Sequence, residues 1–109
     1  MIKITIYKNS NKKYIGFKSL GHAGYADSGH DIICAAVSVL VINTINSIEA
    51  FTKDELKIKT DEAKGLIEFK FVGDISDQST LLMNSLELGL QGIRNDYNDG
   101  YIKIVFKEV

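Results

Sequence analysis

The sequence predicts an α+β fold in which two helices pack on a mostly antiparallel sheet. Segments in which apolar and polar residues alternate with period two occur in pairs, and a short turn-forming cluster joins each pair. Two longer segments without helix breakers separate these strand segments, which gives the element order ββαββαβ. The length of 109 residues fits one domain, which we expect to span residues 1–109.

The first two strands are expected at 2–8 and 14–20. In "IKITIYK" the residues Ile2, Ile4 and Ile6 fall on one face, as in a half-buried strand. The cluster "NSNKK" separates the two segments and is typical of a turn, so the strands are expected to form a hairpin.

A long helix is expected from residue 31 to about residue 51. This segment contains no breaker and is apolar on nearly every side for three turns, which is typical of a mostly buried central helix. Its longest apolar run, near 32–42, contains Ser38 and is expected to be too short to span a bilayer. The N-terminus alternates like a strand, unlike a signal peptide, so a cytoplasmic location without a membrane partner is expected.

A second hairpin is expected from 55–60 and 65–72, joined by "DEAK". A second helix follows, starting near Asp74 or Ser76, which are N-cap residue types, and ending around Tyr97. The segment "YIKIVFKEV" is expected to close the chain as a last strand. The second helix carries apolar residues on one face at i+3 and i+4 spacing, namely Leu82, Leu86, Leu90 and Ile93.

Composition and charge narrow the classes of protein. Apolar residues make up 45% and charged residues 25%, which is ordinary for a soluble globular protein. The net charge is −1, and the basic residues are scattered lysines with the single arginine Arg94, so no basic stripe is visible and no nucleic-acid partner is expected. One cysteine excludes an internal disulfide.

The stretch "GHAGYADSGHDIIC", residues 21–34, contains both histidines and the only cysteine of the chain. Cys34 falls in the opening turns of the long helix, where backbone N–H groups and the helix dipole favour the nucleophilic thiolate. His22 stands at the end of a strand, and the intervening connection must fold back to begin the helix. An imidazole that reaches a helix-start thiol is the minimal arrangement for nucleophilic catalysis. The alternative is that Cys34 fills a small space in a buried helix, since cysteine is often buried.

The neighbouring polar residues have simpler expected roles. His30 is expected near the helix N-cap, although it lies close enough to Cys34 to act as the base instead. Asp31 provides favourable charge in the first turn or half of a capping box with Ser28, and it could also orient the imidazolium. Backbone N–H groups at the helix start, including that of Cys34, are expected to stabilise an oxyanion.

The glycines Gly21, Gly24 and Gly29 are turn formers that also suggest a mobile substrate loop over residues 21–30. Histidine, cysteine and aspartate are metal-ligand types, but their spacing matches no common zinc pattern. We therefore expect neither a metal nor another cofactor.

The run "GHAGYADSGHDIICAAVSVL" resembles the signature of the ribosomal-processing cysteine protease family, often called Prp. The matching segments are Gly21-His22-Ala23, Gly29-His30-Asp31-Ile32-Ile33-Cys34-Ala35 and Ser38, and the length and element order are also similar. The resemblance implies a homodimeric endopeptidase with Cys34 as nucleophile and His22 as general base and acid. It also implies a substrate, the precursor of bacterial large-subunit ribosomal protein twenty-seven, whose N-terminal extension is removed after a Phe.

Two other readings remain open from the residues alone. The chain could be a non-catalytic, ribosome-associated α+β binding module with Cys34 as a core residue. It could also be a different cysteine enzyme, such as an acyl- or thiol-transfer catalyst. The roles of Asp31, Ser38 and His30 in catalysis stay undecided at this stage.

Overall fold

The computed structural model describes residues 1–21, 28–97 and 100–109, with side chains of the first helix described from residue 32 onward. The observed element order is ββαββαβ, as predicted. The seven elements are β1 (Ile2–Lys8), β2 (Tyr14–Leu20), α1 (Ser28–Phe51), β3 (Glu55–Asp61), β4 (Leu66–Val72), α2 (Asp77–Tyr97) and β5 (Ile102–Glu108).

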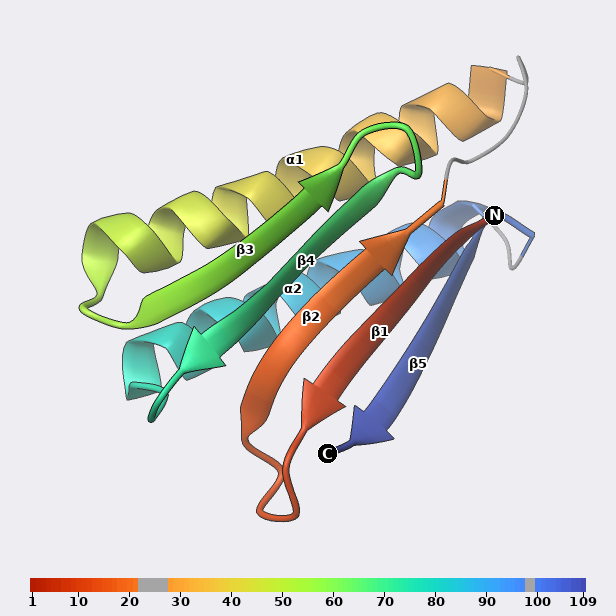
Figure 1. Cartoon of the computed structure of the whole chain (residues 1–109). Coiled ribbons are helices and arrows are strands. Elements are labelled where there is room, and N and C mark those ends of the chain that lie inside the picture. Colours follow the sequence, from red (N-terminus) through yellow and green to blue (C-terminus); the bar gives the residue numbers. More distant parts are fainter. Residues whose placement is uncertain (22–27, 98–99) are drawn as a thin grey trace.

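The five strands form one sheet in the order β3-β4-β2-β1-β5. Three of the four neighbouring pairs are antiparallel, and β1 pairs with β5 in parallel, so the sheet is mixed and mostly antiparallel. Both helices lie behind the sheet in Figure 1, and the face toward the viewer carries no helix. The predicted fold class is therefore confirmed, with two layers and one uncovered sheet face.

The core follows from the period-two alternation of the strands. Alternate residues of β1 are almost completely buried, and the register aligns Ile6 with Phe17 and Phe17 with Phe69 across three strands. The rings of Phe17 and Phe69 stack with their centroids 5.4 Å apart, a favourable offset for two aromatic side chains. This row of aromatic and aliphatic side chains forms the floor on which both helices pack.

Helix α1 begins three residues earlier than predicted, at Ser28, and ends at the predicted Phe51. The apolar run near 32–42 was predicted to be too short to cross a membrane, but residues Ile32–Phe51 as a helix are long and apolar enough to do so by length and composition. One side of this helix is packed into the core, as in the central helix of a folded protein. The buried residues of α1, spaced mainly by three or four, are Ile33, Val37, Val41, Thr44, Ile45 and Ile48.

Helix α2 starts directly after Ser76, one of its two predicted cap residues. The Ser76 hydroxyl accepts a hydrogen bond from the Ser79 backbone N–H at 3.2 Å, which satisfies a donor of the first turn. The backbone N–H and hydroxyl of Ser76 also donate to the Asp54 carboxylate, at 2.9 and 2.6 Å. Hydrogen bonds from Ser76 and, to a smaller extent, Ser79 hold the pKa of the Asp54 carboxyl below its usual value. The contact between Asp54 and Ser76 joins the two ends of the β3–β4 hairpin. It therefore stabilises the fold at neutral pH, and this stabilisation is lost as the pH falls and Asp54 is protonated.

Two glycines of α2 provide a matched pair for measuring how closely the helices approach. A Cβ atom added at Gly92 would meet nothing within 4 Å, so Gly92→Ala is expected to raise the free energy of unfolding by about 0.5–1 kcal/mol through helix propensity. A Cβ added at Gly89 would lie 2.9 Å from Cδ1 of Leu40 in α1. Gly89→Ala is therefore expected to raise the free energy of unfolding by less than Gly92→Ala does, or to lower it. Urea denaturation of the two variants tests this prediction, and equal gains would contradict the close contact.

Candidate active site

Cys34 lies on α1 beside a groove of about 480 Å³. It is the seventh residue of the helix, is half-buried, and packs partly against the hydrophobic core. The groove lies between α1, one end of β1 and β2, and the β3–β4 turn. Its lining residues are Ile2, Ser19, Gly21, Cys34, Val37, Ser38, Thr60, Asp61, Glu62, Gly65, Leu66 and Ile67.

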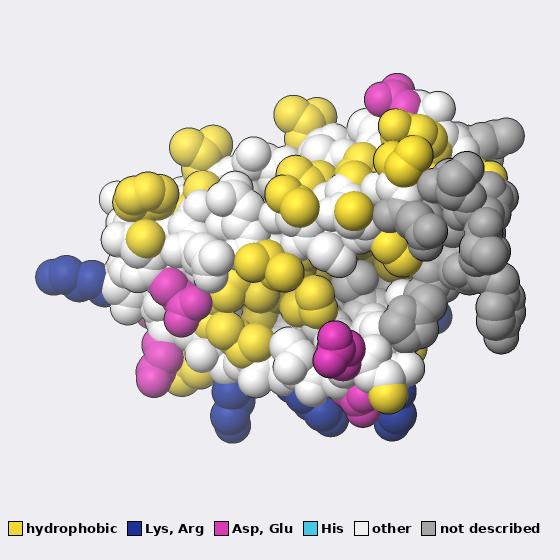
Figure 2. Space-filling view, turned by 90° about the horizontal axis from the view of Figure 1, so that it is seen from above, with side chains coloured by type: hydrophobic (Ala, Val, Ile, Leu, Met, Phe, Trp, Pro, Cys, Tyr) yellow, Lys and Arg dark blue, Asp and Glu magenta, His cyan; other side chains and the backbone are white. Residues whose placement is uncertain are grey.

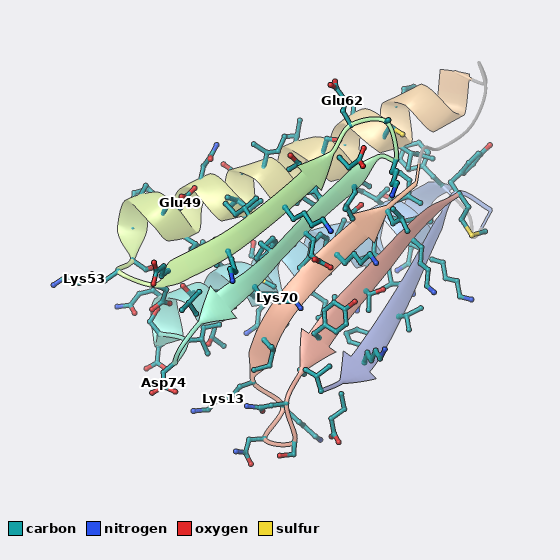
Figure 3. The ribbon with its side chains drawn as sticks, viewed as in Figure 1. Lys13, Glu49, Lys53, Glu62, Lys70 and Asp74 are labelled. Carbon is teal, nitrogen blue, oxygen red and sulfur yellow. The ribbon has the colours of Figure 1, made fainter. Side chains whose placement is uncertain are left out.

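Backbone hydrogen bonds fix the wall of the groove formed by the β3–β4 turn. The turn closes through a hydrogen bond from Gly65 N–H to the Glu62 carbonyl at 3.1 Å, and the Asp61 carboxylate accepts from Lys64 N–H at 3.2 Å. The Gly65 carbonyl then accepts from Gly21 N–H at 3.1 Å. The turn is therefore tied to the end of β2, and Figure 3 shows Glu62 at this turn, beside the N-terminal half of α1.

Gly21 occupies a backbone position that requires glycine. Its φ is +104°, which side-chain-bearing residues rarely adopt, and an added Cβ would lie 2.7 Å from the Met1 carbonyl oxygen. Gly21 directly precedes His22 in the chain. The close approach of the Met1 and Gly21 backbones therefore determines the direction in which the chain leaves the sheet toward His22.

The described surface of the groove combines an apolar floor with a polar rim. Ile2, Val37, Leu66 and Ile67 supply apolar surface, and the charged groups among the described lining residues are carboxylates of the β3–β4 turn. Such a surface can take up a large apolar side chain while hydrogen-bonding a peptide backbone at its edge. Ser38, one helical turn after Cys34, adds a hydroxyl to the same groove.

The predicted site residues fall partly inside and partly outside the described chain. His22 and Gly24 lie outside the described residues. The prediction that Gly29 belongs to a substrate loop is wrong, because it lies in the first turn of α1. His30 lies in the same turn, at the start of the helix as expected. Asp31 also belongs to this helix, and its side chain and that of His30 are outside the described part.

The earlier helix start also corrects two expectations about hydrogen bonding. Ser28 is the first helical residue, so it does not precede the helix as the cap of a box with Asp31. The backbone N–H of a seventh helical residue points to the carbonyl four residues earlier, so the amide of Cys34 is engaged within α1 and is not an oxyanion donor. The amides without an intrahelical acceptor are those of the first turn.

Sequence reasoning missed the contribution of the β3–β4 turn to the groove. The cluster "DEAK" was recognised as a turn, but its place beside Cys34 depends on β4 pairing with β2. No local pattern encodes that pairing.

A half-buried thiol on a helix, facing a groove with an apolar floor, is an arrangement suited to a cysteine protease. Comparison with known proteins supports this class. The chain belongs to the family described as cysteine protease Prp, whose family model matches residues 1–103. The chain is therefore a cysteine protease.

Relatives of known identity align over nearly the whole chain. The ribosomal processing cysteine protease Prp of Staphylococcus aureus is 29% identical over 107 residues, which cover 98% of this chain and 100% of the relative. The protein of the same name from Bacillus subtilis is 28% identical over 103 residues, covering 91% of this chain and 92% of the relative.

Solved structures agree with the fold. Staphylococcus aureus Prp in complex with a substrate peptide superposes with a TM-score of 0.90 at 28% identity, covering 98% of this chain and 100% of the other. The same protease with a covalently linked product peptide gives a TM-score of 0.88 at 29% identity and the same coverage. A Streptococcus mutans protein, at 24% identity and a TM-score of 0.85 over 100% of this chain and 96% of its own, shares the fold.

Proposed function

We propose that this cysteine protease removes the N-terminal extension from the precursor of bacterial large-subunit ribosomal protein twenty-seven, cleaving after a Phe. In this proposal Cys34 is the nucleophile and His22 is the general base and acid. The Staphylococcus aureus and Bacillus subtilis relatives carry the name of ribosomal processing proteases. A ribosomal precursor as substrate implies that the enzyme acts in the cytoplasm.

The observation that carries the proposal is the shared groove of Cys34 and Gly21. Cys34 approaches the groove from α1, and Gly21 holds the end of the strand segment that leads directly to His22. Two rigid elements thus flank the short connection that separates thiol and imidazole in the sequence. This arrangement supports a Cys–His pair, and the covalently linked product peptide of the Staphylococcus aureus relative fits nucleophilic catalysis in that protein.

The reaction then follows the general course of a cysteine protease. His22 accepts the proton of the Cys34 thiol, and the thiolate forms a bond to the carbonyl carbon of the scissile peptide. The tetrahedral intermediate collapses as the C–N bond breaks, and the protonated His22 gives its proton to the leaving amine. Water attacks the thioester with His22 as base, which releases the N-terminal fragment and restores the Cys34 thiol.

The developing oxyanion needs donors other than the Cys34 amide. Side chains of a helix point toward its N-terminus, so the thiol of Cys34 leans toward the preceding turn. The amides of Ser28, Gly29 and His30 in the first turn have no intrahelical acceptor. We assign oxyanion stabilisation to this turn, where these amides and the helix dipole act together.

Cleavage after Phe requires a pocket for one aromatic side chain. Ile2, Val37, Leu66 and Ile67 provide apolar surface within the groove, next to Cys34. Burying a Phe side chain on such a surface contributes about 1.5–3 kcal/mol to binding, which is enough to select it over a small residue. The test is incubation with a synthetic peptide that spans the precursor junction, followed by mass spectrometry. Cleavage after Phe is expected, and an intact peptide would contradict the proposal.

We also propose that the enzyme is a homodimer formed through the outer face of α1. From Ile32 to Ile48 this helix has no charged residue, and Val39 and Ile42 are 66% and 49% exposed. Figure 2 shows hydrophobic side chains standing along this helix. An uncharged helix face with exposed aliphatic side chains is typical of a protein interface.

The dimer prediction can be tested with matched charge insertions. The double variant Val39→Lys, Ile42→Lys is expected to sediment as a monomer, because each lysine would be buried without a partner in a symmetric interface. The control places the same two charges on α2, as Leu81→Lys, Leu88→Lys, at positions that are also exposed. We expect the control to keep the mass of the unmodified protein in sedimentation equilibrium. A monomeric unmodified protein, or equal loss of mass in both variants, would contradict the proposed interface.

A further inference from the structure

We propose that the uncovered face of the sheet is a binding site for single-stranded RNA, which it holds by its phosphates. The lysines that look scattered in the sequence gather on this face. Because strand side chains alternate between two faces, the register that buries the isoleucines of β1 turns Lys3 outward, together with the lysines aligned on the same face of the neighbouring strands. From the sequence alone no nucleic-acid partner is expected, because no basic stripe is visible. The fold removes that reason by bringing the lysines together on one face.

The gathering of charge can be followed across the strands. The register places seven of the twelve lysines of the chain on the uncovered face. Those on β1, β2 and β5 are Lys3, Lys18, Lys103 and Lys107. Those on β3 and β4 are Lys57, Lys59 and Lys70. The acidic residues at equivalent outward positions of these strands are Glu55, Asp61 and Glu68, so the face is basic although the chain as a whole carries a charge of −1.

Figure 2 views the sheet edge-on, with the uncovered face at the lower edge, and dark blue side chains project there. Lys8 forms an ion pair with Glu87 of α2, with Nζ and the carboxylate oxygen 3.6 Å apart, and this pair lies on the helix side of the sheet. Lys3 lies opposite Lys103, and Lys57 lies opposite Lys70. Like charges on directly opposed strand residues are destabilising, and a bound polyanion would offset that cost.

A hollow of about 260 Å³ lies within this face, over β1, β2 and β5. Three lysines line it, Lys3, Lys18 and Lys107, together with the hydroxyl-bearing Thr5 and Tyr7. Lysine ammonium groups and hydroxyls are the usual donors to phosphate and sugar oxygens. The hollow therefore offers three positive charges and two neutral hydrogen-bonding groups within one concave surface.

Tyr7 gives the hollow a surface on which a base can stack. Its neighbour across β2 is Gly16, which places no side chain beside the ring. The stem of Lys70 crosses this gap, since an added Cβ at Gly16 would lie 3.1 Å from Lys70 Cγ, and Figure 3 shows Lys70 on the uncovered side of the sheet. Tyr7 is partly exposed. Positive charge that follows the backbone, combined with aromatic rings on which bases stack, is how single-stranded nucleic acids are bound with little sequence preference.

Other occupants fit this face less well. A second copy of the chain in a symmetric contact would place the same lysines against one another. The hollow contains only Leu20 and Val105 as aliphatic groups, which gives little to insert into a membrane. An acidic peptide would satisfy the charges but would leave the Tyr7 ring unused. RNA also surrounds a ribosomal substrate, and this last point alone rests on the proposed function.

The proposal can be tested by fluorescence anisotropy with a labelled oligouridine of about 15 nucleotides. The test variant is the triple substitution Lys3→Gln, Lys18→Gln, Lys107→Gln, which empties the hollow of charge. The matched control, Lys12→Gln, Lys13→Gln, Lys53→Gln, removes the same total charge from residues outside the sheet strands. We expect the test variant to bind at least about 10-fold more weakly at low salt and to show a slope of log affinity against log salt that is shallower by about 2. The control is expected to stay within about 2-fold of the unmodified protein.

Several results would overturn the proposal. These are undetectable binding of oligouridine at about 50 mM salt, equal losses in the two triple variants, and tighter binding of polyglutamate or of anionic lipid vesicles than of RNA. Cleavage of the junction peptide is measured in parallel and is expected to be the same in the test variant as in the unmodified protein. An enzyme that cleaves the peptide without binding RNA would refute this inference alone. An enzyme that binds RNA without cleaving the peptide would refute the proposed function alone.

Discussion

Replacing Cys34 by alanine is expected to abolish cleavage of the junction peptide while leaving the fold intact. Removing the nucleophile of a protease lowers kcat by roughly 10⁴-fold or more, because only binding and oxyanion stabilisation remain. Cys34 is half-buried, and alanine is small and favours helix, so the thermal midpoint is expected to change little. Rates come from mass spectrometry of the products, and circular dichroism checks the fold.

The partner imidazole can be identified by comparing the two histidines of the chain. His22→Ala is expected to reduce cleavage about as much as Cys34→Ala, whereas His30→Ala, which removes the same group at the helix start, is expected to cost less than about 10-fold. The double variant lacking Cys34 and His22 is expected to be no slower than either single variant, since groups that act as a unit are not additive. Activity retained in Cys34→Ala would exclude Cys34 as the nucleophile. A larger loss of activity in His30→Ala than in His22→Ala would identify His30 as the base.

Local patterns in the sequence were sufficient to predict the elements and their order. The alternation of "IKITIYK" predicted β1 because one face of it had to be buried, and Ser76 predicted the start of α2 because its hydroxyl can cap a first turn. The start of α1 was misplaced by three residues because Gly29 was taken for a loop residue. A glycine in the first turn costs only about 1 kcal/mol, which the packing of a long buried helix offsets.

The candidate site was harder to predict because it depends on strands that are distant in the sequence. The motif around His22 and Cys34 was visible in the sequence and pointed to one end of the sheet. The β3–β4 turn lies at that site only because β4 pairs with β2, and pairing between strands so far apart in the sequence leaves no local sequence pattern. The lysine face was overlooked for the same reason. Lysines at alternating positions of five strands form a surface only once the strand order is known.

Gly21 connects the fold to the proposed chemistry, and Gly21→Ala is expected to lower both the stability of the protein and its rate of peptide cleavage. The substitution would force a Cβ to 2.7 Å from the Met1 carbonyl oxygen and place alanine at a φ of +104°. Strain at such a backbone position costs about 1–3 kcal/mol, and relief of the contact would shift either β1 or the hydrogen bond from Gly21 to Gly65. Because His22 is the next residue, the same shift would move the proposed base.

The matched control for Gly21 is Gly73→Ala. Gly73 also has a positive φ, +84°, but an added Cβ there would meet nothing within 4 Å, so this variant carries the backbone strain without the collision. We expect urea denaturation to show a larger loss of stability for Gly21→Ala than for Gly73→Ala. Below the unfolding transition, peptide cleavage is expected to fall at least about 10-fold only in Gly21→Ala, because a displacement of about 1 Å in a catalytic group can cost 10²-fold in rate. Equal losses of stability in the two variants would show that the Met1 carbonyl moves away from the added Cβ without lowering the free energy of unfolding. Full activity in folded Gly21→Ala would show that the end of β2 does not position His22.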